Sequence, residues 1–223
     1  MKIGVLGTGA VGEAIGSKLA ELGHSVMMGS RTSNNEKALA FANKHKDGLA
    51  SAGTFKDAAA FGEMIFNCTK GLETLNILKS AGEENLNGKV LVDVSNPLDF
   101  SGGMPPTLSV CNTSSLGEEI QRAFPNVLVV KSLNTMWCGL MVNPKMIAGG
   151  DHNVFISGND TSAKEFVTEL LMAFGWKKEN IVDLGDIRTA RGTEMLLPLW
   201  LSIFMSRNNG AFNFRIVDQD FGK

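Results

Sequence analysis

The sequence predicts an α/β protein of the Rossmann type, with a doubly wound, mostly parallel sheet and a short helical C-terminal extension. Short apolar segments of strand length alternate with helical segments, as in a parallel sheet flanked by helices. The glycine-rich sequence GTGAVG, residues 7–12, separates the first strand from the first helix. The length of 223 residues favours one large domain over two. We expect a Rossmann-like domain at 1–185, a substrate loop near 99–114, and a C-terminal extension at 186–223 within the same globule.

Seven strands are expected from short runs rich in aliphatic and β-branched residues. They lie at residues 2–6, 25–29, 64–68, 89–94, 127–132, 154–157 and 181–184. The first helix is predicted at 11–22, because apolar residues recur on one face and Gly23 follows it. A second amphipathic helix is predicted at 161–174, ending at Gly175.

Two further helix starts are predicted from capping-box patterns, in which Ser is followed three residues later by Glu. The pairs are Ser33 with Glu36, and Ser115 with Glu118. The segment 99–114 is rich in glycine, proline and serine and follows a strand. In an open α/β sheet this is where ligands bind, so the segment is either a substrate loop or an ordinary surface connection.

The C-terminal extension contains the apolar sequence MLLPLWLSIFM at residues 195–205. This run is shorter than the roughly 18 to 20 residues that a membrane-spanning helix requires. Its apolar residues occupy most sides of a helix, and one small domain offers little surface to cover them. We therefore expect a homodimer, with this helix and the segment 211–217 at the interface.

Composition excludes several classes of function. The formal net charge of −2 provides no basic surface for nucleic acid. The three cysteines are widely spaced and match no disulfide or metal-binding pattern, so we expect no metal and a reducing, cytoplasmic environment. No secretory signal follows Met1, and we expect no membrane association.

The first turn has the G-x-G-x-x-G spacing of a dinucleotide-binding site, and it stands in the required context of strand before and helix after. Gly7 permits the tight turn, Gly9 allows backbone N–H groups to approach a pyrophosphate, and Gly12 allows close helix packing. The helix N-terminus favours the anion. The predicted cofactor contacts in this turn are Gly7, Thr8, Gly9, Ala10, Val11 and Gly12.

The second strand ends without the acidic residue that binds ribose hydroxyls in NAD-dependent proteins. In its place are Ser30, Arg31 and Thr32, with Lys37 as a possible further contact. A guanidinium flanked by two hydroxyls matches a ribose 2′-phosphate, whereas a carboxylate would repel it. We therefore predict NADP(H); the alternative is a solvated arginine in a turn.

Further candidate contacts to the cofactor follow later strands. These are Cys68, Thr69, Asn96, Pro97 and Asn134; ordinary turn chemistry is the alternative explanation.

Met136 and Trp137 either stack on a substrate or cap the core. The histidines, His24, His45 and His152, have no partner that the sequence identifies, so we expect them to be structural or solvated and leave the catalytic residues unassigned.

Several segments together resemble the NADPH-dependent deazaflavin oxidoreductases and related dinucleotide-binding reductases. They are GTGAVGEAIGSKLAELGHSVMMGSR, DVSNPL, VVKSLNTM, VFISGND and IVDLGDIRTARGTE. The reductase domain of the six-transmembrane metalloreductases is similar too. The resemblance implies NADP selection by Gly29, Ser30 and Arg31, and hydride transfer to a deazaflavin or flavin held face to face with the nicotinamide. Backbone N–H groups after Leu133 would then stabilise charge on the acceptor.

One feature departs from that family's chemistry. The deazaflavin coenzyme carries an anionic tail, yet residues 99–121 contain Asp99, Glu118 and Glu119 and no lysine or arginine. Basic groups elsewhere could serve, from Lys70, Lys131, Arg188 or Arg191. A flavin or another small acceptor therefore stays open, as does a non-catalytic NADP(H)-binding redox sensor or regulatory subunit.

Overall fold

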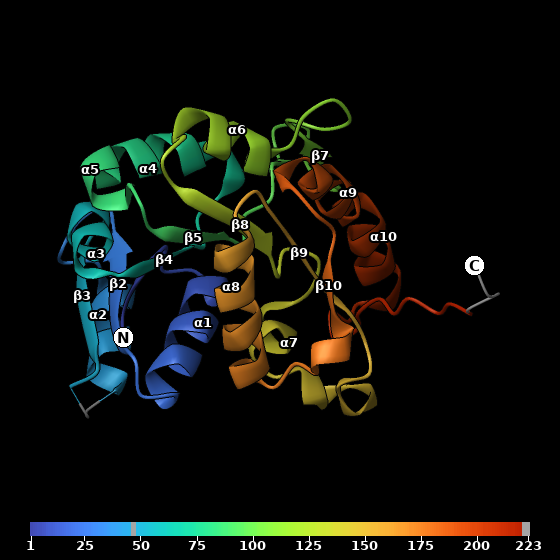
Figure 1. The fold of residues 1–223 in the computed structure, drawn as a ribbon, viewed down its shortest axis with the longest axis horizontal. Coiled ribbons are helices and arrows are strands. Elements are labelled where there is room, and N and C mark those ends of the chain that lie inside the picture. Colours follow the sequence, from blue (N-terminus) through green and yellow to red (C-terminus); the bar gives the residue numbers. More distant parts are fainter. Residues whose placement is uncertain (46–47, 220–223) are drawn as a thin grey trace.

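The computed structural model describes residues 1–45 and 48–219, and it forms an eight-stranded sheet with helices on both faces (Figure 1). The strand order is β10-β9-β8-β5-β4-β1-β2-β3. The six strands β8, β5, β4, β1, β2 and β3 all run parallel. At the other edge, β9 is antiparallel to β8, and β10 is parallel to β9. Strands β6 and β7 form a separate two-stranded sheet. The predicted fold class, a doubly wound and mostly parallel sheet with a helical C-terminal region, is confirmed.

The strands are β1 (Lys2–Leu6), β2 (Ser25–Ser30), β3 (Ala50–Thr54), β4 (Met64–Asn67), β5 (Val90–Asp93), β6 (Leu98–Asp99), β7 (Thr107–Leu108), β8 (Leu128–Ser132), β9 (Val154–Gly158) and β10 (Ile181–Asp183). The α-helices are α1 (Ala10–Glu21), α2 (Glu36–Lys44), α3 (Phe55–Phe61), α4 (Thr74–Ala81), α5 (Glu83–Leu86), α6 (Leu116–Ala123), α7 (Cys138–Val142), α8 (Thr161–Phe174), α9 (Ala190–Met195) and α10 (Leu197–Arg207). The short 3₁₀ helices are η1 (Gly71–Glu73), η2 (Pro144–Met146), η3 (Ala148–Gly150), η4 (Lys178–Asn180) and η5 (Ile187–Thr189). None of the helices in the described ranges is long and apolar enough to span a membrane.

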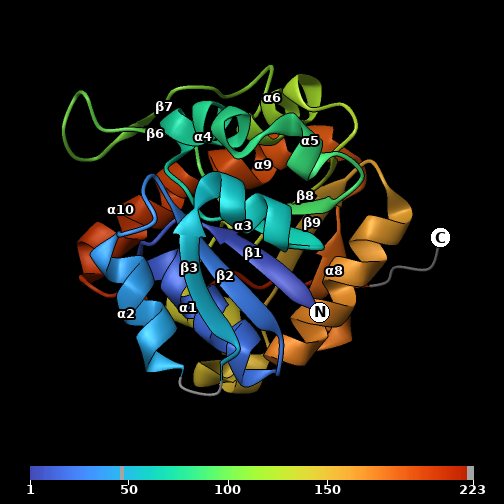
Figure 2. The same cartoon turned by 90° about the vertical axis from the view of Figure 1, so that its left-hand side faces the viewer.

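Alternate residues of the central strands enter two separate cores, as the two-residue period of a strand requires. Val5 and Phe66 belong to the core under α1, α2, α7 and α8, whereas Leu6 and Ile65 belong to the core under α3 to α6. Figures 1 and 2 show these helix layers on opposite faces of the sheet. Because the central strands are buried on both faces, they are apolar throughout.

Edge elements were the least predictable. Strand β3, with the sequence ASAGT, lacks a clear apolar alternation, and its pairing with β2 decides its conformation. The predicted Ser33 cap is wrong: the Asn35 side chain accepts hydrogen bonds from the Lys37 and Ala38 backbone N–H groups, both at 3.1 Å. The Ser115 cap is confirmed, because its hydroxyl accepts the Glu118 N–H at 3.1 Å.

The apolar run at residues 195–205 begins at the last residue of α9 and continues into α10, with Pro198 in the first turn of α10. Only Leu197 and Leu201 of α10 are buried, and Leu199 is 51% exposed. The following segment lies along residues 151–153. There the Asn153 N–H donates to Phe214 O at 2.9 Å, and Asn213 Nδ2 lies 2.7 Å from His152 Nδ1. His152 is thus a buried side chain with hydrogen-bond contacts from both ring nitrogens.

Candidate functional site

The glycine turn between β1 and α1 is held in a conformation that larger residues would disturb. Gly7 has a φ of +115°, and its N–H donates to Gly29 O at 3.0 Å. A Cβ on Gly12 would lie 2.1 Å from Gly7 O, so glycine lets α1 approach the turn closely. At Gly9 nothing lies within 4 Å of where a Cβ would be. The turn is therefore tightly packed on its inner side and open at Gly9.

The N-terminus of α1 can receive an anion. Gly9 is the N-cap residue and offers no side-chain acceptor for the first N–H groups of this 12-residue helix. These donors and the helix dipole point to the open side of the turn. Together with the packing at Gly7 and Gly12, they fit the pyrophosphate of a dinucleotide.

Two adjoining hollows lie beside this turn, at the carboxyl ends of the central strands. The first, of about 300 Å³, is lined in part by Gly7, Thr8, Gly9, Ser30 and Arg31. The second, of about 610 Å³, is lined in part by Val11, Val94, Asn96, Leu98 and Phe100. Both are lined by Arg31, Cys68, Thr69, Lys70 and Glu73. The carboxyl ends of parallel strands are the usual ligand crevice of this fold.

The structure brings most of the predicted contacts together at these hollows. Five predicted residues do not line them: Ala10, Gly12, Thr32, Pro97 and Asn134. Gly12 packs beneath the turn, and Asn134 forms reciprocal hydrogen bonds with Asn96 at 2.8 and 2.9 Å. These two residues therefore support the walls from behind.

The turn after β2 presents a free guanidinium. The Ser30 hydroxyl donates to Thr32 O at 2.5 Å, which holds the turn. Arg31 is exposed and has no hydrogen-bond or ion-pair partner among residues 1–45 and 48–219. Since Arg31 lines both hollows, its fork is available to a phosphate.

Cys68 is an unreactive group in this wall. Burial, with a smaller effect from the negative charge of Asp93, raises the pKa of the Cys68 thiol far above its usual range. A little of its surface faces the hollows, but the thiol stays protonated at neutral pH. Cys68 can therefore contact a ligand by packing and not as a nucleophile.

A buried polar row crosses the sheet behind the hollows. Asn67, Asp93 and Lys131 are register partners on the neighbouring strands β4, β5 and β8. Asp93 Oδ1 accepts from Asn67 Nδ2 at 2.7 Å, and Asp93 Oδ2 accepts from Lys131 Nζ at 2.7 Å. Asn67 Oδ1 accepts from the Thr69 hydroxyl at 2.7 Å. The row thus links the sheet interior to the wall of both hollows.

Glu194, from α9, completes this row. Its carboxylate accepts Lys131 Nζ at 2.8 Å and the backbone N–H groups of Leu116 and Gly117 at 2.7 and 3.0 Å. Burial alone would lower the pKa of Lys131, but the charges of Asp93 and Glu194 outweigh it, and the pKa is raised. Sequence reasoning missed Asn67 and Glu194. Asn67 ends a strand beside that of Asp93, but nothing in the sequence indicates that Glu194 reaches them.

Met136 and Trp137 do not line either hollow. Met136 is buried in the core of the α1 face, so its role is to cap the core. Trp137 is 40% exposed beside Gly210. The prediction that these residues stack on a substrate in the hollows is therefore not supported by their positions.

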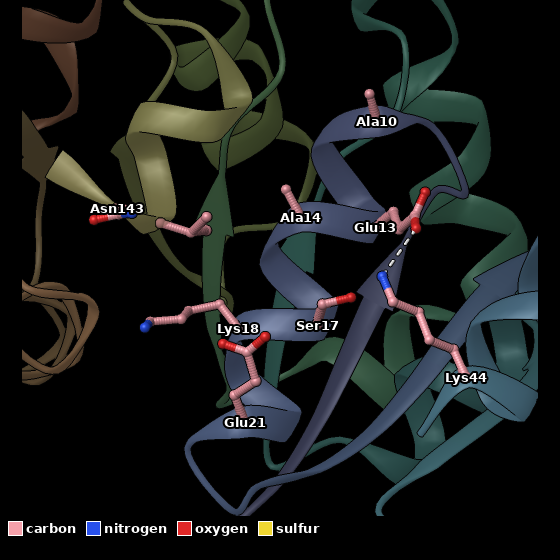
Figure 3. Close-up of a pocket in the computed structure, with 9 residues that line it drawn as sticks. Ala10, Glu13, Ala14, Ser17, Lys18, Glu21, Lys44 and Asn143 are labelled. Atoms are coloured by element: carbon pink, nitrogen blue, oxygen red, sulfur yellow. Dashed lines mark hydrogen bonds and ion pairs between the residues drawn. The ribbon is translucent and has the colours of Figure 1, made fainter. Parts of the chain in front are cut away.

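A separate groove of about 510 Å³ runs between α1 and α7 (Figure 3). Ala10 lies at one end, and Glu13 forms an ion pair with Lys44 at 3.4 Å across one side. Lys18 and Glu21 line the lower part. With charges of both signs and no glycine turn, the groove lacks the features of the nucleotide site.

Comparison with known proteins shows which family this chain belongs to. The family model for "NADP oxidoreductase coenzyme F420-dependent" matches residues 2–97. The crystal structure of a candidate F420-dependent NADP-reductase from Arthrobacter sp. FB24 is 48% identical, covers 98% of this chain and 100% of its own, and has a TM-score of 0.91. The chain belongs to this family. It is therefore a member of a family of NADP-dependent oxidoreductases.

More distant proteins are also similar to this chain. The metalloreductase STEAP3 of Rattus norvegicus is 29% identical over 205 residues, which are 89% of this chain and 38% of that protein. The chain thus spans less than two fifths of that relative. A reductive aminase from Aspergillus terreus in complex with NADPH is 16% identical, with a TM-score of 0.64 over 92% of this chain and 63% of its own. This last likeness concerns the fold alone.

Proposed function

We propose that this family member transfers a hydride between NADP(H) and a deazaflavin, flavin or flavin-like acceptor. The observation that carries the proposal is the pair of adjoining hollows. The first lies beside the open glycine turn and the free Arg31. The second adjoins it at Thr69 and extends to Phe100. One hollow suits the adenosine half of the cofactor. The other has room for the nicotinamide and a second ring.

Each wall residue has a distinct task in this proposal. The backbone at Gly9 and the α1 N-terminus bind the pyrophosphate, and Arg31 binds the 2′-phosphate. Thr69 and Asn96, held by the buried row and by Asn134, orient the nicotinamide. NADP(H), when bound, supplies the hydride, so the chain's own task is to hold two flat rings at near-attack distance.

The second candidate function is a non-catalytic NADP(H) sensor. Two observations favour it. No histidine among the described residues lines either hollow, and the Cys68 thiol, whose pKa is raised, is a poor acid. Hydride transfer to a flavin-type ring is equally compatible with this wall, because such a ring needs positioning more than proton transfer. Turnover with an added acceptor separates the two candidates.

We further propose a homodimer that covers α10. Met195, Leu199 and Met205 are 41%, 51% and 49% exposed on α9 and α10. Val217, in the segment that follows, is 85% exposed. A second copy of this surface would remove these apolar side chains from water.

The test is anaerobic mixing of the purified protein with NADPH and a flavin. We expect absorbance at 340 nm and at the acceptor's band to fall together, with one NADPH oxidised per acceptor reduced. A tryptophan-fluorescence titration with NADPH serves as the binding control. NADPH binding without transfer to any flavin or deazaflavin would favour the sensor, and no binding would overturn both candidates.

A further inference from the structure

The outer part of the second hollow has large apolar walls. Leu72 and Phe100 are 52% and 55% exposed, and both line it. Leu72 lies in η1, and Phe100 follows β6, the strand that contacts η1 and pairs with β7 in the hairpin labelled in Figure 2. Exposed apolar side chains from separate segments at one hollow are suited to the faces of a flat ring.

The charge of this outer wall is negative. Asp99 lines the hollow between Leu98 and Phe100. Its carboxylate accepts the Ser101 backbone N–H at 2.8 Å, and this bond lowers the pKa of Asp99, so that the group is ionised at neutral pH. Residues 99–121 contain no lysine or arginine to offset it.

Other basic residues near the domain's ligand edge are already engaged. Lys131 is 1% exposed and bonded to two carboxylates. Arg188 is paired with Asp186, and Arg191 donates to Glu118 at 2.8 Å. None of the three lines either hollow.

Two cations line the second hollow in the part of the chain that the structure describes, namely Arg31 and Lys70. Both also line the first hollow, next to the glycine turn. In the proposed binding mode, these two cations compensate the phosphates of the dinucleotide. The outer wall, formed by Leu72, Leu98, Asp99, Phe100 and Ser101, therefore has Asp99 as its charged residue.

We propose that the acceptor is a flat, uncharged ring system whose side chain carries no phosphate or carboxylate. This inference rests on the proposed function and narrows its acceptor class. With the cofactor bound, an anionic tail would meet the negative charge of both the dinucleotide and Asp99, and like charges repel. In the transfer, the C–H bond at nicotinamide C4 breaks, the acceptor ring gains the hydride with its two electrons, and solvent supplies a proton.

The test compares riboflavin with FMN, which share one ring system and differ by a terminal phosphate. NADPH oxidation is measured at saturating NADPH and low ionic strength. We expect the KM for FMN to be at least fivefold higher at similar kcat, and the difference to shrink in high salt because salt screens the repulsion. An equal or lower KM for FMN at low salt overturns the inference.

Two charge reversals complete the experiment. Asp99→Lys is expected to lower the FMN-to-riboflavin KM ratio at least threefold, whereas Glu165→Lys, an exposed position on α8, should leave the ratio unchanged. A preference for FMN would remove this inference and leave the reductase proposal standing. If neither flavin is reduced while NADPH binds, this inference falls, whereas the reductase proposal falls only if a deazaflavin is not reduced either.

Discussion

Lys131 Nζ lies 2.8 Å from Glu194 Oε1, and both side chains are only 1% exposed. This contact joins β8 of the sheet to α9 of the C-terminal region. Because Glu194 also accepts two backbone N–H groups at the start of α6, it connects three segments that are distant in sequence. The carboxylate is well supplied with donors, as a buried charge requires.

Replacing Lys131 by Met should destabilise the fold strongly. The substitution leaves the buried carboxylates of Asp93 and Glu194 without their shared cation, and we expect a loss of about 3 to 5 kcal/mol in the free energy of unfolding. Urea denaturation followed by tryptophan fluorescence measures this loss. Lys145→Met, at an exposed position, is the matched control and should cost little. A loss below about 1 kcal/mol for Lys131→Met would show that the row is energetically neutral.

Arg31→Ala should weaken NADPH binding and leave NADH binding unchanged. The guanidinium has no partner within the described ranges, so its removal costs no internal contact. Loss of a charge-assisted contact of about 1.5 to 3 kcal/mol corresponds to a roughly ten- to hundredfold higher Kd for NADPH. Tryptophan fluorescence titration with both nucleotides measures it. Equal losses for NADPH and NADH would argue against a role in selecting the 2′-phosphate.

Two alanine substitutions in the glycine turn should have different effects. At Gly12 a Cβ would lie 2.1 Å from Gly7 O, so Gly12→Ala is expected to cost about 1 to 3 kcal/mol of stability by overpacking. At Gly9 nothing in the protein lies within 4 Å of a Cβ. Gly9→Ala should therefore keep its melting temperature within a few degrees and still lose NADPH affinity, because the methyl group occupies the approach to the pyrophosphate.

Calorimetry and titration of both variants test this pair of expectations. If Gly9→Ala binds NADPH as tightly as the wild type, the open side of the turn is not where the pyrophosphate binds.

The Glu118–Arg191 pair should make stability depend on pH in the acid range. The hydrogen bond from Arg191, with a smaller one from Ser115, lowers the pKa of Glu118. A lowered carboxyl pKa contributes stability above its unfolded value of about 4.3, and this contribution is lost as the pH falls through the folded pKa. Glu118→Gln should therefore cost about 1 to 2 kcal/mol at pH 7, and its difference from the wild type should shrink as the pH falls below about 4.3.

Urea unfolding at several pH values measures this dependence. Glu119→Gln, one residue along the same helix, is the control. A Glu118→Gln difference that stays constant from pH 7 to pH 3 would contradict an ionic contribution.

Leu199→Glu should dissociate the proposed homodimer. The Leu199 side chain is 51% exposed on α10, and a charge there would have to be buried in the proposed interface. Light scattering at micromolar concentration should give twice the chain mass for the wild type and the chain mass for the variant. Leu39→Glu, at a 42% exposed position on α2, is the control. A monomeric wild type would refute the dimer.

The sequence was most informative where a local pattern fixes the geometry. The glycine turn, α1 and the Ser115 cap depend on residues close in the chain, and the structure has them where they were predicted. The edge strand β3 was missed because pairing with β2 imposes its conformation. The side chains of Ser33 and Asn35 can both accept backbone N–H groups at a helix start. The turn after Arg31 ends at Asn35, so Asn35 and not the predicted Ser33 caps α2.

By itself, the sequence determined the α/β fold class, the dinucleotide turn and the candidate phosphate-binding arginine, because each depends on periodicity or on neighbours within about one strand–turn–helix unit. The tertiary structure alone decided which polar residues meet at the sheet's carboxyl edge. Asn67, Asp93 and Lys131 come together through strand register, and Glu194 reaches them from the far end of the chain. Such contacts require the whole sheet to form, since no local pattern encodes the pairing of strands that are 26 to 38 residues apart.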